Sequence, residues 1–310
     1  MNATLTLHRQ DSTTLTLSAC LKFSLLLERY TPYSTLRASF VCDDTDNLSD
    51  VCRAVFRLDG RCLHDGIMRD FKIETAQNRR ILHVTSRSFM EVLLHNQLVP
   101  GLHTNVTLYS LMNAYALPHI TYETSVSATN YIYVKENTGM WDAISAYNYK
   151  YNHNVPYVNF SNYLRMNPKQ DTPTPLPVSS LVSFFEGGNT SAVLSRIDMA
   201  DVDGTYGTFT LSNPDAAARE IVRVKQIAFD KQFAASPMDA LRYRIALGNR
   251  RLKQKSVTYF GYCGEDIEDY ITCGNYLSGH ISRMRIIGTP QGVQTTDTLY
   301  FDSFCNPISL

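Results

Sequence analysis

Apolar and polar residues alternate over much of the first 84 residues. The alternation is clearest at Leu5/Leu7, Leu15/Leu17, Phe71/Ile73 and 81–84. A period of two predicts half-buried antiparallel strands. Because Asp59-Gly60 and Asp65-Gly66 are typical hairpin-turn dipeptides, we expect a meander that closes into a small sandwich or barrel.

After this region the period changes to that of a helix. Residues 88–95 predict a short helix that Ser88 could cap, and the apolar spacing over 108–115 predicts a second one. The segment 131–144 reads as a strand, a turn at 137–139, and a helix that carries Trp141 and Ile144 inward. The sequence thus predicts a small mixed module between β-rich regions.

Four of the twelve prolines lie within residues 168–177, which predicts a linker or boundary. Strand-like runs follow, together with one helix that begins after Ser236, with Pro237 at its first position and Asp239 completing a capping box. We therefore predict an α+β chain. A barrel-like antiparallel β domain spans 1–90, a small α/β insert spans 91–175, and a second barrel-like β domain with one amphipathic helix spans 176–310.

Composition narrows the class of protein. Of 310 residues, 44% are hydrophobic and 19% charged, which is the balance of an ordered globular protein. The 29 basic and 29 acidic residues give no net charge, whereas nucleic-acid-binding domains carry a basic excess. The most apolar stretch, residues 15–27, is too short to cross a bilayer, and no secretion signal opens the sequence. We expect no sequence-specific nucleic acid, no membrane insertion, and folding in a cytoplasm.

Cysteine usage favours reduced thiols over a disulfide framework. The number is odd and no C-x-x-C pair occurs. Ten-residue spacings suit small buried side chains on successive short strands. The cysteines are Cys20, Cys42, Cys52, Cys62, Cys263, Cys273 and Cys305.

Motifs of catalysis and cofactor binding are missing from the sequence. It contains no H-E-x-x-H, G-x-S-x-G, Walker lysine loop or G-x-G-x-x-G, so no metal and no cofactor is expected. The nearest catalytic candidates are Glu265, Asp266, Glu268 and Asp269, interpreted as a solvated loop tip or, alternatively, as the acid and base of a glycoside hydrolase. Trp141 is either a core residue or a residue that stacks on a sugar.

One run of basic residues is uninterrupted by acids. It comprises Arg242, Arg244, Arg250, Arg251, Lys253 and Lys255. It can form the solvated face of a helix and its C-terminal dipole partners, or a docking surface for an acidic partner, or the wall of a channel.

Several short segments, taken in order, resemble a known family. They are Leu94-His-Asn-Gln-Leu-Val-Pro100, Val134-Lys-Glu-Asn-Thr-Gly-Met-Trp-Asp-Ala-Ile144, Leu194-Ser-Arg-Ile197 followed by Asp203-Gly-Thr-Tyr206, Pro237-Met-Asp-Ala-Leu241, and Tyr259-Phe-Gly261. Their order and spacing resemble the tail hub proteins, or baseplate hubs, of Mu-like and PBSX-like contractile phage tails and related contractile particles.

The resemblance implies a non-enzymatic virion protein. In that family, three chains with two barrel-like tube domains each form a pseudo-sixfold ring. The ring joins the six-fold tail tube to the three-fold spike and nucleates baseplate assembly. The implied partners are further copies of the chain, the spike protein, the tail tube or tube-initiator protein, and baseplate wedge proteins. The setting would be a phage tail, a tailocin or another contractile injection device. The segment around Trp141 also resembles the peptidoglycan-binding LysM module.

Two other functions remain open at this stage. A wall-acting protein would use Trp141 in a sugar site and the acids at 265–269 for hydrolysis, and it would clear or bind purified peptidoglycan. A secreted β-rich adhesin fits less well with reduced cysteines and the missing signal.

Overall fold

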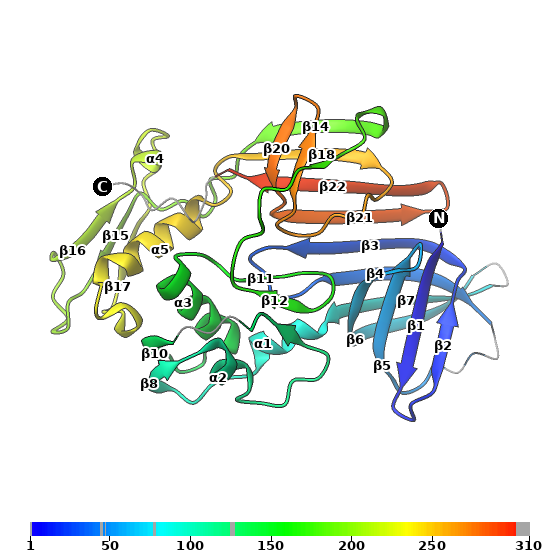
Figure 1. Ribbon diagram of the computed structural model, residues 1–310, viewed down its shortest axis with the longest axis horizontal. Coiled ribbons are helices and arrows are strands. Elements are labelled where there is room, and N and C mark those ends of the chain that lie inside the picture. Colours follow the sequence, from blue (N-terminus) through cyan, green and yellow to red (C-terminus); the bar gives the residue numbers. More distant parts are fainter. Residues whose placement is uncertain (1, 44–45, 47, 77–78, 125–127, 302–310) are drawn as a thin grey trace.

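The computed structural model describes residues 2–43, 46, 48–76, 79–124 and 128–301. The chain is mostly β, with a few helices gathered beside one end of a large sheet (Figure 1). In the described part no sheet closes into a barrel.

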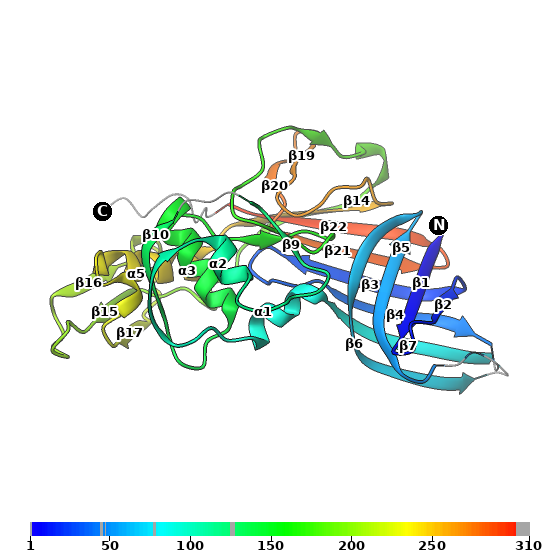
Figure 2. The same cartoon turned by 60° about the horizontal axis from the view of Figure 1, so that its bottom comes forward.

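The large sheet has eleven strands, and every neighbouring pair is antiparallel. In spatial order these are β14 (Leu181–Gly187), β18 (Gln254–Phe260), β22 (Gly292–Tyr300), β21 (Arg283–Thr289), β3 (Cys20–Glu28), β4 (Thr35–Cys42), β7 (Arg79–Ser88), β6 (Arg61–Ala76), β5 (Val51–Leu58), β1 (Ala3–Arg9) and β2 (Thr14–Leu17). Register shifts interrupt the pairing of β6 with β5 and with β7. Such bulges bend strands, and Figure 2 shows the strong curvature of β5 and β6.

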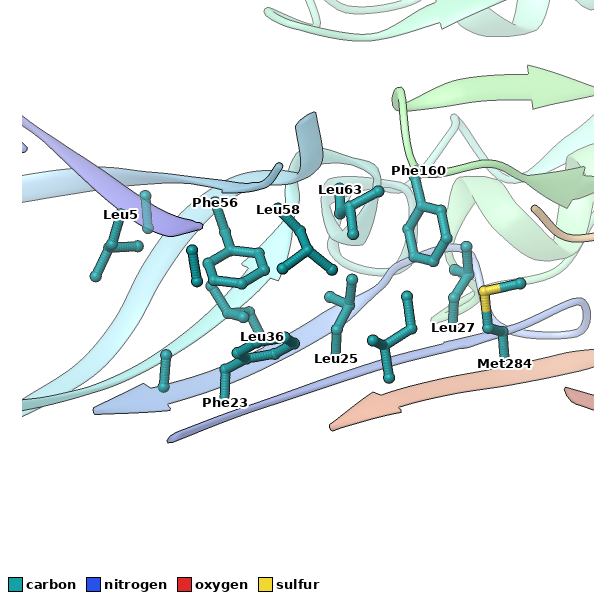
Figure 3. Packing of buried hydrophobic residues seen from close by; sticks show 14 of the residues in the cluster. Leu5, Phe23, Leu25, Leu27, Leu36, Phe56, Leu58, Leu63, Phe160 and Met284 are labelled. Carbon is teal, nitrogen blue, oxygen red and sulfur yellow. The ribbon is translucent and has the colours of Figure 1, made fainter. Parts of the chain in front are cut away.

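The predicted α+β class agrees in part with the structure, which is mostly β with a few helices, but within the described residues the two β regions do not form the two barrel-like units that were predicted. Strand β3 pairs with β21 from Arg283↔Glu28 to Gly288↔Phe23, which joins the first and last parts of the chain. The apolar faces of the N-terminal and C-terminal strands lie in one buried core. Figure 3 shows Met284 of the C-terminal region and Phe160 of the insert beside Leu25 and Leu27 of β3. The boundaries at residues 90 and 175 stay predictions.

The mixed insert has its own hydrophobic core. Its elements are η1 (Phe89–Glu91), α1 (Val92–His95), β8 (Gly101–Val106), α2 (Leu108–Met112), β9 (Thr121–Tyr122), β10 (Thr129–Val134), α3 (Met140–Asn152), β11 (Tyr157–Val158) and β12 (Tyr163–Arg165). The expected strand and helix around Trp141 are confirmed as β10 and α3, and both Trp141 and Ile144 are buried in this core. The helix predicted over 108–115 ends at Met112.

Two smaller sets of elements complete the fold. One is a three-stranded sheet formed by β13 (Thr174–Pro175), β19 (Tyr270–Cys273) and β20 (Leu277–His280), and η2 (Val178–Ser180) comes shortly after β13 in the chain. The other packs a helix on a small mixed sheet, at the left of Figure 1. It contains β15 (Arg196–Met199), β16 (Phe209–Ser212), α4 (Pro214–Ala217), β17 (Val224–Ile227), η3 (Lys231–Phe233) and α5 (Pro237–Asn249).

Of the two predicted Asp-Gly turns, one is confirmed and one is wrong. Asp59 and Gly60 form the β5–β6 turn, with positive φ at both residues, as predicted. Asp65 and Gly66 instead lie inside β6. A Cβ at Gly66 would stand 2.1 Å from the carbonyl oxygen of Arg87, so glycine serves close strand packing here and not a turn.

Candidate functional site

The basic run begins on α5 and ends on β18. It does not form a free positive surface, because four of its six side chains have an acidic partner within the chain. These pairs are Arg242–Asp239 (3.0 Å), Arg244–Asp230 (2.6 Å), Arg251–Glu28, and Lys255–Glu186 (3.5 Å). Much of the charge of the run is therefore used to hold α5 and β18 against the rest of the fold.

Asp230 is the most buried acid in contact with this run. Its side chain, 2% exposed, accepts from Arg244 and also pairs with Lys135 of the insert at 3.0 Å. Burial opposes ionisation of Asp230, but the two cations outweigh burial and lower its pKa. The pair with Lys135 connects the insert to the module that contains α5.

A cavity of about 270 Å³ lies beside this connection, between β10, α3, η3 and α5. Its polar lining includes Lys135, Asp142, Asp230, Gln232 and Arg244. Burial raises the pKa of Asp142. Lys135 and Arg244 already pair with Asp230. The cavity can therefore hold a small polar group, but its lining has no strong net charge that would favour an anion or a cation.

Arg250 and Lys253 differ from the rest of the run. Within the residues that the structure describes, neither has an ion-pair partner. The Arg250 guanidinium lies 5.2 Å from the centre of the Tyr30 ring and donates to the carbonyl oxygen of Leu247. Lys253 is exposed. Docking of a partner at Arg250 and Lys253 stays a prediction, and of the two only Lys253 is fully exposed.

The acidic loop differs from the predicted solvated tip. Glu265 and Glu268 are 2% and 1% exposed, and all four acids have partners inside the chain. Glu265 accepts from the Tyr259 hydroxyl and the Cys263 N–H, Glu268 pairs with Arg29 (2.8 Å), Asp269 pairs with Lys169 (2.6 Å), and Asp266 accepts from the N–H groups of Phe160 and Ile267 (3.2 and 2.7 Å). The loop turns inward because its carboxylates satisfy these donors, which is a structural use of the acids.

Asp297 was not singled out from the sequence. It lies at the centre of β22, is fully buried, and faces Val257 and Met284 on the neighbouring strands. Neither of its carboxyl oxygens has a hydrogen-bond partner among the described residues. Burial raises its pKa well above the usual range, and the nearby Glu265 carboxyl raises it further. Its alternation with buried Leu299 was the only sequence signal of burial.

Trp141 is 7% exposed and packs in the core of the insert, so it presents no open face to a sugar. No three His, Cys, Asp or Glu side chains of the described ranges gather as metal ligands. No helix in that part of the chain is long and apolar enough to cross a membrane.

The cysteines only partly match their prediction. Cys42, Cys52 and Cys62 lie on β4, β5 and β6, which follow one another in the sequence, as expected. Cys42 and Cys273 are buried, but Cys52, Cys62 and Cys263 are exposed, so the expectation of buried side chains is wrong for these three. Cys305 lies outside the described residues.

Comparison with known proteins finds likeness in structure alone. No protein-family model and no curated protein matches the sequence. The tail protein from Neisseria meningitidis MC58 superposes with a TM-score of 0.73 at 11% identity, over 99% of both chains. The 43 kDa tail protein of prophage MuSo2 from Shewanella oneidensis gives 0.72 at 10% identity, over 97% of this chain and 98% of that one.

A third similar structure comes from a secretion system. The c3393 protein of E. coli, described as a type VI secretion system component similar to the T4 bacteriophage tail proteins gp27 and gp5, gives a TM-score of 0.56 at 10% identity. That match covers 92% of this chain and 74% of the other. The chain therefore has the fold of phage tail proteins over its whole length, as the motif order suggested.

Proposed function

We propose that this protein is the structural hub of a contractile tail or related injection particle, where three copies form a ring between tube and spike. The observation that carries the proposal is the fold likeness to phage tail proteins, because it spans nearly all of both chains. The role is structural, and we assign no reaction to it.

The large sheet supports a ring to which each chain contributes two groups of strands. One chain provides a group of strands from its N-terminal region and another from its C-terminal region, joined side by side at β3 and β21. In the proposal these are the two barrel-like tube domains of residues 1–90 and 176–310. Three chains then present six similar groups to a six-fold tube while keeping three-fold symmetry toward a spike.

The remaining surfaces take partner roles in this proposal. The ring binds the spike protein on one side and the tail tube or its initiator on the other, with baseplate wedge proteins around it. Arg250 and Lys253 form the docking surface for an acidic neighbour, since the other cations of the run are paired within the chain. The LysM-like insert is a packed module and not a glycan site, because Trp141 is buried.

Particle assembly in a strain that lacks this chain tests the proposal. We expect electron micrographs of its lysates to show no complete tails or tubes attached to baseplates, and a plasmid copy of the gene to restore them. Complete tails in the deletion strain would refute a hub role.

A further inference from the structure

The cavity of about 270 Å³ beside Asp230 lies where the insert meets the module that contains α5. Residues of β10, of the turn after it and of α3 form one wall, and residues in or next to η3 and α5 form the other. Figure 1 shows α3 and α5 as neighbours on the left side of the molecule. A small molecule bound in this cavity would therefore contact both parts of the fold at once.

One buried hydrogen-bond donor in the cavity wall lacks a partner. The Gln232 side chain is 4% exposed, and its Oε1 accepts the backbone N–H of Tyr133, which fixes the orientation of the amide. The Nε2 group is buried and has no hydrogen-bond partner among the residues that the structure describes. Because a buried donor without an acceptor destabilises a fold, an acceptor from a bound molecule would satisfy Gln232.

Asp230 does not supply a further acceptor, because its two oxygens already accept several donors. Oδ1 lies 3.0 Å from Lys135 Nζ and accepts the Gln232 N–H at 3.1 Å, and Oδ2 accepts from Arg244 at 2.6 Å. Arg244 also donates to the carbonyl oxygen of Ala240. An ammonium group has three N–H donors and a guanidinium five, so both cations have donors beyond those that these bonds use. This side of the cavity therefore suits a carboxylate.

Asp142 supplies an acceptor at the rim of the same cavity. It lies in the first turn of α3, lines the cavity and is exposed. Its carboxylate forms no ion pair with any residue of the described ranges, since the nearby Lys135 is paired with Asp230. A carboxylate in this position can accept a charge-assisted hydrogen bond from an ammonium group of a ligand. The cavity thus offers donors on one side and an acidic acceptor on the other.

We propose that this cavity binds a small α-amino acid in its zwitterionic form. The carboxylate of the ligand accepts from Gln232 Nε2 and from Arg244, and its ammonium group donates to Asp142. A simple anion would leave Asp142 unpaired, and a simple cation would leave Gln232 without an acceptor. The two basic and two acidic side chains of the lining sum to zero charge, as do the charges of the ligand. Val134 and Ala146 line the remaining wall, which suits a small apolar side chain.

Three probes of matched shape separate the two charges of the ligand. Racemic leucine carries both, 4-methylpentanoate lacks the ammonium group, and 3-methylbutylamine lacks the carboxylate. In calorimetric titrations of the full chain at pH 7, we expect leucine to bind at least about tenfold more tightly than either analogue, because each analogue loses charge-assisted hydrogen bonds. Equal binding of the three probes would overturn the proposal. So would the lack of saturable binding by racemic alanine, valine and leucine.

A pair of acid-to-amide variants locates the ammonium group of the ligand. Asp142→Asn removes the proposed acceptor, and the matched control is Glu136→Gln, because Glu136 is exposed in the turn after β10 and does not line the cavity. Both acids are exposed, so both variants keep their fold, which circular dichroism checks. We expect Asp142→Asn to bind leucine no more tightly than 4-methylpentanoate, whereas Glu136→Gln keeps the wild-type preference. If Asp142→Asn still prefers leucine, the proposed site is wrong.

Thermal unfolding gives an independent readout of the same site. A ligand that binds only the folded chain raises its melting temperature with the logarithm of ligand concentration. We expect leucine to raise the melting temperature of the wild type and of Glu136→Gln, and to raise that of Asp142→Asn less at each concentration. Equal shifts in all three proteins would contradict the site. These tests do not depend on a ring, so their failure leaves the hub proposal standing, and a leucine-binding chain that stays monomeric with the spike would refute the hub alone.

Discussion

Replacing the buried Asp297 by asparagine should stabilise the fold at neutral and alkaline pH. Both carboxyl oxygens lack partners among the described residues, and burial followed by the nearby Glu265 carboxyl raises the pKa of Asp297. A carboxyl with a raised pKa in the folded state contributes its full stability below the unfolded pKa, and this contribution is lost as pH rises toward the folded pKa. The asparagine side chain has nearly the same shape as that of aspartate and never ionises.

The magnitude follows from the proton that Asp297 must retain. An unfolded aspartate titrates near 3.9, and each pH unit above that value costs about 1.4 kcal/mol while the folded group stays protonated. Asp297→Asn should therefore leave the free energy of unfolding almost unchanged at pH 4 and raise it by about 1.4 kcal/mol for each pH unit over which folded Asp297 keeps its proton. Because Asp297 is coupled to Glu265, the steepest change belongs to the pair.

Urea unfolding followed by circular dichroism at fixed protein concentration measures this effect. Asp203→Asn is the control, because Asp203 is exposed and its carboxyl makes no ion pair among the described residues. The control should change stability by no more than about 1 kcal/mol, without growing as pH rises. An Asp297→Asn variant that is less stable than wild type at pH 8, or equally shifted at pH 4 and pH 8, would refute the reasoning.

Three further predictions concern packing, acid stability and docking. Gly66→Ala should lower stability by about 1–3 kcal/mol in thermal unfolding, because its Cβ would stand 2.1 Å from a carbonyl oxygen of β7; an unchanged melting temperature would contradict this close approach. Burial lowers the pKa of His64 to about 3, so the unfolded chain binds a proton below pH 6.5 that the folded chain does not. Wild type should lose stability from pH 6.5 toward 3, and His64→Gln should lose less over that range in urea titrations; equal losses would be inconsistent with this account. Arg250→Ala with Lys253→Ala should reduce the yield of assembled particles while lowering the free energy of unfolding by no more than about 1 kcal/mol, through the lost contact of Arg250 with Tyr30, and an unaltered yield would argue against docking there.

Local patterns identified several elements because they depend on neighbours in the sequence. The helix that starts at Pro237 and the turn at Asp59-Gly60 follow from the backbone preferences of those residues. The capping box was predicted less well, since the Ser236 side chain makes no capping hydrogen bond. Period-two alternation tells which side chains share a face, but it does not name the neighbouring strand. The pairing of β3 with β21 joins residues more than 250 positions apart, and this is why two separate barrels were predicted.

The acids show a second limit of sequence reasoning. A cluster such as Glu265 to Asp269 is usually solvated, and it is buried here because donors from distant segments, among them Arg29 and Lys169, converge on it. Likewise, three cations of the basic run meet acids that only the fold brings near, whereas Arg242 pairs with Asp239 three residues earlier on the same helix. The resemblance to phage tail proteins agreed with the observed fold because it used the order of many weak segments, whereas single-residue roles depend on contacts that spacing does not reveal.

The mass of the purified protein in solution, alone and mixed with the spike protein of the same particle, tests the central claim most directly. The account predicts about 105 kDa for three copies of the 35.1 kDa chain, or a monomer that becomes a three-to-three assembly with the spike. A mass of 35.1 kDa both alone and with the spike protein would contradict the hub function, and clearing of purified peptidoglycan would then be the next assay.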